Sequence, residues 1–366
     1  ARTAAWSIYG DATWHLNSRL NLTAGLRATR DNKTFSWYTP PRQAPGVDRT
    51  LDQLEQAGLL TLAARLAHTT PQALRAALSR NLVYADAVGQ QVSRHNRWND
   101  LSPRLVLDYH FSPNVMGYAS LAKGYKAGGY NGVQVNSAFA PEQVWNLETG
   151  VKSWLPEQHL QLDASLYAYR YDNRQALTLI PSSTGIGVPQ YRVSNTDQRA
   201  TGLDLQAQWQ PFGELRLGFN ASVIDATYRH AVTASGVDLS GQPAGEPLLS
   251  WAASASYRWV DIAHGNLQLS ARHGYRGRTR CNEYTIYQGS CSAATPFTLG
   301  GVRQRTDLRL AWDTRDGQWG VAVYANNLFN QRYVESIINV STDVLGTPYA
   351  IVTPPRSWGM ELRVAL

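Results

Sequence analysis

Apolar and polar residues alternate strictly along most of this chain. Between Leu160 and Tyr169 every even position is Leu or Ala, and every odd position is Gln, Asp, Ser or Tyr. Successive side chains of an extended strand point to opposite faces, so this period of two predicts half-buried β-strands. The same alternation recurs in segments 20–27, 202–209, 214–221, 251–259, 308–312 and 358–366.

The lengths of the strands and of their connections indicate a membrane barrel. The strands extend for about 10 to 18 residues, whereas strands of globular proteins usually have about five or six, and a bilayer crossing needs roughly 9–11. Short and long connections also alternate along the chain, which is typical of transmembrane β-barrels. The short ones lie at 15–19, 112–114, 156–158, 211–213, 261–265 and 313–318, and the long ones near 39–96, 126–141, 180–190, 229–246, 278–301 and 329–354.

Aromatic residues gather beside the short turns. If these turns share one side of a barrel, the aromatics form a girdle at one membrane interface, whereas the core of a soluble protein would scatter them along the strands. The residues concerned are Trp14, Phe111, Trp154, Trp209, Trp259, Trp312 and Trp319.

The pattern gives about thirteen strands, whereas single-chain bacterial barrels usually have an even number. We therefore expect an all-β, antiparallel transmembrane barrel whose earlier strands are missing, with residues 1–366 as its C-terminal portion. Residues 51–82 depart from the alternation and are predicted to be helical, with Thr70 and Pro71 as a helix N-cap and first residue. This helical insert in an external loop is either a lid or recognition element, or a mobile insert.

Composition narrows the class of protein. The chain has no run of 18 apolar residues that would predict a transmembrane helix, and only 17% of its residues are charged. Twelve Trp and 19 Tyr suit a surface that is apolar on one side and wet on the other, although carbohydrate-binding β-proteins share this bias. The net charge of +7 comes from scattered arginines without a basic stripe, so nucleic acid is not expected as a partner.

The sequence offers no catalytic or metal-binding constellation. His residues are dispersed, and Asp and Glu occur singly, so neither a nucleophile with its base nor paired carboxylates is predicted, and no enzyme activity, metal or cofactor is expected. Cys281 and Cys291 are close in sequence and lack a second pair or a His cluster. In an exported protein they are expected to close a small loop disulfide rather than hold zinc.

Several segments, in this order, resemble the barrel of TonB-dependent outer-membrane receptors of the siderophore type. The resemblance covers the chain from about Leu101 to Leu366, while residues 1–100 match only in strand pattern. The segments are SPRL at 102–105, YASLAKGYKAGGYN at 118–131, PE at 141–142, WNLETGVK at 145–152, Asn195 with GLDL at 202–205, NNLFNQRY at 326–333 and PRSWG at 355–359.

The resemblance implies a 22-stranded barrel in the bacterial outer membrane, with an N-terminal plug and energy delivered through the TonB protein. It implies active uptake of an iron–siderophore or a similarly scarce nutrient. This sequence has neither a plug-like domain nor a recognisable TonB box, and it ends at Leu366 instead of the family's usual aromatic residue. The alternatives are therefore a non-functional truncated receptor, a passive channel or porin, and a soluble β-rich binding module.

Aromatic and arginine residues in the external loops are the candidate ligand contacts. Arginine forks and aromatic faces suit anionic, catechol-bearing iron chelates, but arginines near the outer leaflet equally suit the phosphates of lipopolysaccharide. The candidates are Tyr125, Tyr130, Arg276, Arg278, Arg280, Tyr284 and Tyr287.

Overall fold

The computed structural model describes residues 1–79, 87–132, 134–180, 190–233, 235–291, 298–338 and 349–365. Thirteen strands form one antiparallel sheet in which each strand pairs with the next one along the chain, apart from two small hairpins set aside from it. The sheet strands are β1 (Arg2–His15), β2 (Leu20–Trp37), β3 (Val92–Ser112), β4 (Val115–Lys126), β7 (Glu142–Leu155), β8 (Leu160–Ile180), β9 (Gln190–Trp209), β10 (Leu215–His230), β11 (Leu249–Ile262), β12 (Gly265–Arg276), β13 (Arg303–Thr314), β14 (Trp319–Asn326) and β17 (Ser357–Val364).

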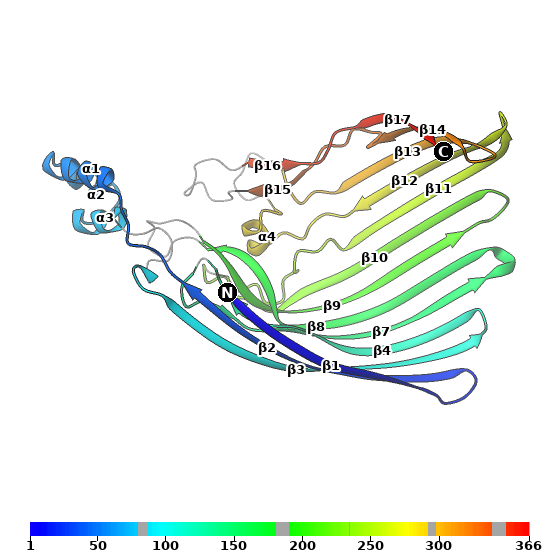
Figure 1. Cartoon of the computed structure of the whole chain (residues 1–366), viewed down its shortest axis with the longest axis horizontal. Helices are drawn as coiled ribbons and strands as arrows, with labels where there is room; N and C mark the ends of the chain where they lie inside the picture. The colour runs from blue at the N-terminus through cyan, green and yellow to red at the C-terminus, as the bar shows by residue number, and fades with distance from the viewer. Residues whose placement is uncertain are drawn as a thin grey trace.

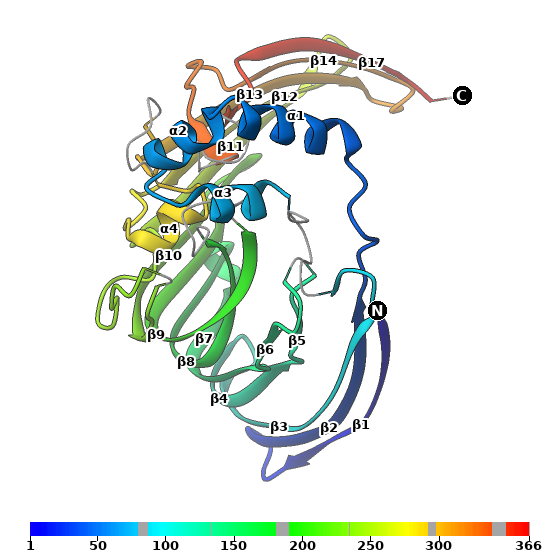
Figure 2. The same cartoon turned by 90° about the vertical axis from the view of Figure 1, so that its left-hand side faces the viewer.

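The sheet curves around a hollow, with β1 and β17 as its two edges (Figures 1 and 2). The small hairpins β5 (Gly129–Tyr130) with β6 (Ala138–Phe139), and β15 (Val334–Ile338) with β16 (Tyr349–Val352), belong to the long connections. The predicted antiparallel sheet of about thirteen long strands is thus confirmed.

The connections alternate as predicted. Short turns join β1 to β2, β3 to β4, β7 to β8, β9 to β10, β11 to β12 and β13 to β14, and they lie together at the right-hand end of Figure 1. The long connections lie at the other end, which we call the loop end. Within them, residues 80–86, 181–189, 292–297 and 339–348 lie outside the described part of the chain, and so does the predicted last strand residue, Leu366. Among the described residues no helix is long and apolar enough to cross a bilayer.

The two faces of the sheet differ in polarity, because apolar and polar residues alternate along each strand and successive side chains point to opposite faces. The row of side chains that contains Leu166 is apolar, yet it is exposed and not buried in a core, with Leu166 itself 56% exposed. The opposite row contains Trp37 and Trp98, which contact Tyr130 of β5, and β5 lies inside the curve of the sheet (Figure 2). The polar face therefore lines the hollow, and the apolar face is the outer one.

Most of the aromatics beside the short turns lie on the outer face, but Trp154 was wrongly included in this girdle. Trp154 pairs with Gln161 and shares the polar row with Glu148 and Lys152, so its ring points toward the hollow. The wrong prediction came from position along the chain, since nearness to a turn does not decide which face a side chain takes.

The helical insert consists of three helices, α1 (Pro45–Gln56), α2 (Leu59–Leu66) and α3 (Pro71–Leu78). It begins six residues earlier than predicted, at Pro45, and the predicted part 80–82 lies outside the described residues. Thr70 caps α3 as expected, because its side chain accepts a hydrogen bond from the Ala73 amide. Leu51, Leu60, Ala64 and Leu74 form a small core of their own, so the insert is a separate packing unit beyond the sheet (Figure 1).

Candidate functional site

The loop between β4 and β7 is fastened to the polar face at the loop end. The ring of Tyr130 lies 5.8 Å from that of Trp37 and 6.0 Å from that of Phe35. The indole of Trp37 donates to the carbonyl of Asn131, and the Asn131 side chain accepts from the Val193 amide of β9. These contacts join three separate parts of the chain, so Tyr130 is held among aromatic neighbours and does not project freely.

Glycines at positions 128 and 129 permit this close approach. A Cβ on Gly128 would lie 2.6 Å from the Phe139 carbonyl and 2.8 Å from the Trp98 ring, and one on Gly129 would meet the Phe139 ring. The sequence GGYN at 128–131 therefore has a structural role, in which the two glycines let Tyr130 and Asn131 reach their contacts.

Tyr125 belongs to a polar network where β3 and β4 separate. Their pairing ends at Arg104 and Ala122, and beyond that point Tyr125 donates its hydroxyl proton to Asp31 over 3.2 Å. The carboxylate of Asp100, only 1% exposed, accepts from Lys123 at 2.6 Å. It also accepts from Gln143 at 2.9 Å and Ser102 at 2.7 Å, so the burial of this charge is offset by three donors.

The other candidate residues lie across the hollow, in the connection between β12 and β13. This connection contains the short helix α4 (Glu283–Tyr287), with Asn282 as its cap. Tyr284 is only 4% exposed, and it packs on Tyr228 and donates to the Val232 carbonyl. Burial raises the pKa of its hydroxyl above the usual value for tyrosine.

Arg280 is also committed to internal contacts. Its guanidinium pairs with Asp225 at 2.5 Å and donates to the carbonyls of Glu246 and Ala226. Cys281 and Cys291 are joined by a disulfide, which closes the segment that contains α4. Arg276 and Arg278 are exposed, and Tyr287 is half-buried.

The seven candidates come from two separate connections. Tyr125 and Tyr130 contact residues of β2, in a loop that also reaches β9 through Asn131, and the other five belong to the end of β12 and the connection after it, whose helix α4 contacts β8 and β10. Only Arg276 and Arg278 are both exposed and without a described polar contact. All seven residues lie at the loop end, as expected from their positions, but sequence position did not show which side chains fold back into contacts.

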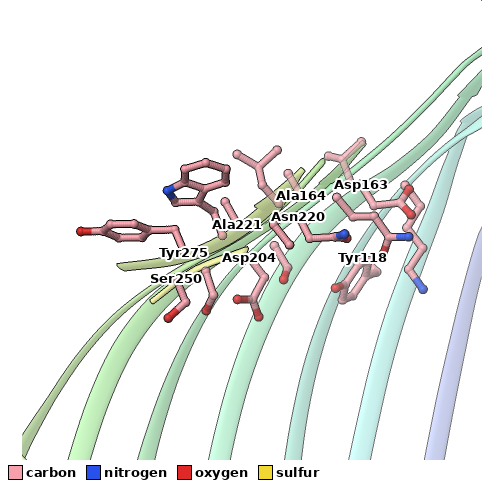
Figure 3. A pocket seen from close by; sticks show the side chains of 16 residues that line it. Tyr118, Asp163, Ala164, Asp204, Asn220, Ala221, Ser250 and Tyr275 are labelled. Atoms are coloured by element: carbon pink, nitrogen blue, oxygen red, sulfur yellow. The ribbon is translucent and has the colours of Figure 1, made fainter. Parts of the chain in front are cut away.

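A shallow cavity of about 620 Å³ lies along the middle of the sheet (Figure 3). Its lining includes residues of both faces of the sheet, and Tyr118, Lys152, Asp163 and Asp204 are among those on the polar face. The ammonium group of Lys152 lies 5.5 Å from the centre of the Tyr118 ring, and the Tyr118 hydroxyl donates to Glu148. This part of the hollow is mainly acidic and rich in hydrogen-bonding groups.

The polar face of β12 and β13 is basic, a feature that was not predicted from the sequence. Arg276 lies directly opposite Arg303, and Arg305 lies opposite Gly274. A Cβ built on Gly274 would have no atom within 4 Å, so there is open space beside Arg305. We name this basic face the arginine wall: Arg272, Arg276, Arg303, Arg305 and Arg309. Asp307 lies within it, opposite Arg272. The signal was present in the same alternating row as Arg272 and Arg276 on one strand and Arg303 and Arg305 on the next.

Most arginines of this wall have internal partners. Arg303 donates to the carbonyls of Val334 and Glu335, Arg305 pairs with Asp307 and Arg309 pairs with Glu361. Like charges placed opposite one another destabilise a sheet, so Arg276, which has no described polar partner, is the member of this face that favours an anionic partner.

Among the described residues, no group of three or more His, Cys, Asp or Glu side chains is placed to hold a metal ion.

The family model described as TonB dependent receptor-like, beta-barrel matches residues 1–328. Among solved structures, the ferric yersiniabactin uptake receptor FyuA from Yersinia pestis is similar with a TM-score of 0.66 and 18% identity, over 99% of this chain and 45% of that one. The copper transporter OprC matches with a TM-score of 0.64 and 14% identity, over 98% of this chain and 48% of that one.

The siderophore receptor PiuA from Acinetobacter baumannii matches with a TM-score of 0.63 and 13% identity, over 98% of this chain and 42% of that one. This chain thus spans less than half the length of these three structures, which show that it shares their fold. The family is one of transport receptors of the Gram-negative outer membrane and not of enzymes. From its family match over residues 1–328, this chain belongs to the TonB-dependent receptor β-barrel family.

Proposed function

We propose that this chain is the barrel portion of an outer-membrane receptor that takes up iron–siderophore complexes, energised through TonB by a region outside this sequence. The family match carries the proposal, and the names of FyuA and PiuA support iron–siderophore cargo. The copper transporter OprC shares the fold, so the chemistry of the hollow must distinguish between cargoes.

Arg276 and Arg278, which are exposed and have no described polar contact, favour an anionic cargo. Arg276 lies at the loop end of the wall, and Arg278 follows it in the loop, so both lie where a ligand arriving from outside would first meet this wall. Guanidinium groups bind carboxylates and catecholates through paired hydrogen bonds, which matches the oxygen-rich surface of many iron chelates.

Equilibrium binding of an anionic ferric chelate, ferric tris-catecholate, tests this function in the complete receptor. Replacing both Arg276 and Arg278 by Ala should weaken binding by roughly a hundredfold or more, since each arginine would lose a charge-assisted hydrogen bond that contributes about 1.5–3 kcal/mol. Tyr284→Ala should also weaken binding, because loss of this buried ring loosens the segment that holds Arg278 and Arg280.

Arg315→Ala is the matched control, since Arg315 lies in a short turn at the far end of the sheet and pairs with Asp261. Unchanged affinity in both the arginine and Tyr284 variants would remove these residues from the ligand site. Uptake that persists in cells without TonB would instead favour a passive channel.

The disulfide can be tested separately. Cys281 and Cys291 should resist a thiol-labelling reagent in the unfolded protein until a reductant is added. Removing this short loop closure by Cys281→Ser together with Cys291→Ser should destabilise the α4 segment by up to about 3 kcal/mol and increase its cleavage by protease. Labelling of both thiols without reductant would contradict the bond.

A further inference from the structure

One side of β3 is paired along only part of its length. With β2 it forms a continuous ladder from Val92 to Tyr109 without a register shift. With β4 it pairs only from Arg104 to Ser112, so residues 92–103 have a partner strand on one side alone. β2 separates β3 from β1, so this unpaired stretch lies inside the sheet, between two strands that a short turn joins.

The alternation of the ladder shows which backbone groups face the unpaired side. The amide of His110 donates to the carbonyl of Arg19, so the even-numbered residues of β3 direct their backbone groups toward β2. Successive residues of an antiparallel strand alternate in this direction. The odd-numbered residues from Ser93 to Asn99 therefore direct theirs away from β2, and in the described part of the chain these groups have no backbone partner. We call the backbone of Ser93–Asn99 on this side the open edge.

Buried polar contacts hold β4 away from the open edge. Where the pairing ends, Lys123 of β4 donates to the buried Asp100 carboxylate at 2.6 Å and to the Leu101 carbonyl at 3.2 Å. Two residues further on, Tyr125 donates to Asp31 of β2. The hairpin of β5 and β6 that follows β4 lies inside the curve of the sheet (Figure 2). The separation of β3 and β4 is thus built into the fold, and the open edge is preformed.

The side chains of the open edge leave its backbone accessible. Its odd-numbered residues are all exposed. Two of their side chains contact β2, with Arg97 donating to Asn32 over 2.9 Å and His95 lying 3.1 Å from Thr34. Between residues 92 and 99 the pairing with β2 has no bulge and the sequence has no proline, two features that commonly protect an exposed strand edge.

The charge of the open edge favours an acidic partner. Residues 93–99 include two arginines and one histidine and no acidic residue. Two copies of this edge placed side by side would oppose like charges, which destabilises a sheet. A strand with carboxylates at alternate positions would instead place them beside Arg97 on the outer face.

We propose that the open edge of β3 binds an extended, acidic segment of another protein by strand addition. Each odd-numbered residue from Ser93 to Asn99 supplies one backbone donor and one acceptor to the added strand, and Arg97 pairs with its carboxylates. The open edge lies at the loop end on the wall of the sheet, so this interaction is independent of the cargo in the hollow.

Binding of a short peptide to the complete receptor in nanodiscs tests the proposal. In the probe, which is capped at both ends, glutamate alternates with threonine, and its affinity is measured by fluorescence anisotropy. Residues directly opposite one another share a face, so the glutamates that meet Arg97 are also the residues whose amides face β3. Methylation of the glutamate nitrogens should therefore weaken binding by about tenfold or more, whereas methylation of the threonine nitrogens is the matched control and should have a much smaller effect.

Amide hydrogen exchange of β3 gives a second measurement that needs no variant. With the unmethylated peptide bound, exchange at the odd-numbered residues from Ser93 to Asn99 should slow by about tenfold or more. The even-numbered amides of this stretch are already bonded to β2 and should change little. Mass spectrometry with electron-transfer fragmentation resolves the two sets of residues.

Two pairs of variants test the backbone and the charge separately. His95→Pro removes one amide of the open edge and spares the ladder with β2, so it should weaken binding of the glutamate peptide by about tenfold. His95→Gln keeps that amide and should change the affinity by less than about twofold. Arg97→Gln should weaken binding by about threefold, and Arg94→Gln, which lies on the inner face, should have a smaller effect.

Equal binding of the two methylated peptides would overturn the proposal, as would no binding of the unmethylated peptide or unchanged exchange at the odd-numbered amides. Self-association of the receptor that His95→Pro abolishes would identify a second copy as the occupant and would also overturn it. None of these outcomes depends on the identity of the transported ligand.

Discussion

Replacing Lys123 by Met should destabilise the protein by about 3–5 kcal/mol, because it leaves the carboxylate of Asp100 buried without its cation. Asp100 is 1% exposed and Lys123 13% exposed, so water cannot take the place of the ammonium group. Gln143 and Ser102 continue to donate hydrogen bonds, but they cannot neutralise the charge. The measurement is the free energy of unfolding in guanidinium after refolding into lipid vesicles.

Two further variants separate this effect from a general loss of charge. Arg309→Met breaks an ion pair with Glu361 of similar length, 2.7 Å, but both partners are about half exposed, so its cost should stay below about 1 kcal/mol. Adding Asp100→Asn to Lys123→Met removes the buried charge and should restore much of the lost stability. Equal losses in Lys123→Met and Arg309→Met would contradict the interpretation of Asp100 as a buried charge.

The pattern of alternation predicts the sheet well because it reports a property of each strand alone. A period of two fixes which residues share a face, and each short turn makes the two strands that it joins neighbours, so these strand pairs and the edge where the turns lie follow without distant contacts. The same logic assigns Thr70 to the start of a helix, where the capping interaction is local.

The loop contacts could not be predicted in this way because they join residues far apart in sequence. Tyr284 was predicted to contact ligand, yet its hydroxyl reaches the Val232 carbonyl 52 residues away and its ring is buried. Arg280 similarly reaches Asp225 across 55 residues. Nothing in the local sequence of the loop distinguishes these residues from the exposed Arg278.

The arginine wall was missed for a different reason. The alternation placed its members on the polar face, but only the register between β12 and β13 brings Arg276 opposite Arg303 and leaves space at Gly274 beside Arg305. Register across a long loop depends on how that loop closes, and the sequence alone does not specify it.

Leu166→Arg should destabilise the protein by about 2–4 kcal/mol in vesicles, because it places a charge on the face that contacts hydrocarbon.

Its neighbour Ser165 provides the matched control on the same strand. Ser165 points toward the hollow, opposite Asp204 in the register, so Ser165→Arg gains a carboxylate partner and should cost less than about 1 kcal/mol. Both variants add the same side chain at the same depth, and only the face differs. Unfolding free energies in vesicles therefore measure directly which face meets lipid. If Ser165→Arg proved as damaging as Leu166→Arg, the outer apolar rows would have to pack against protein, and the assignment of the two faces would be wrong.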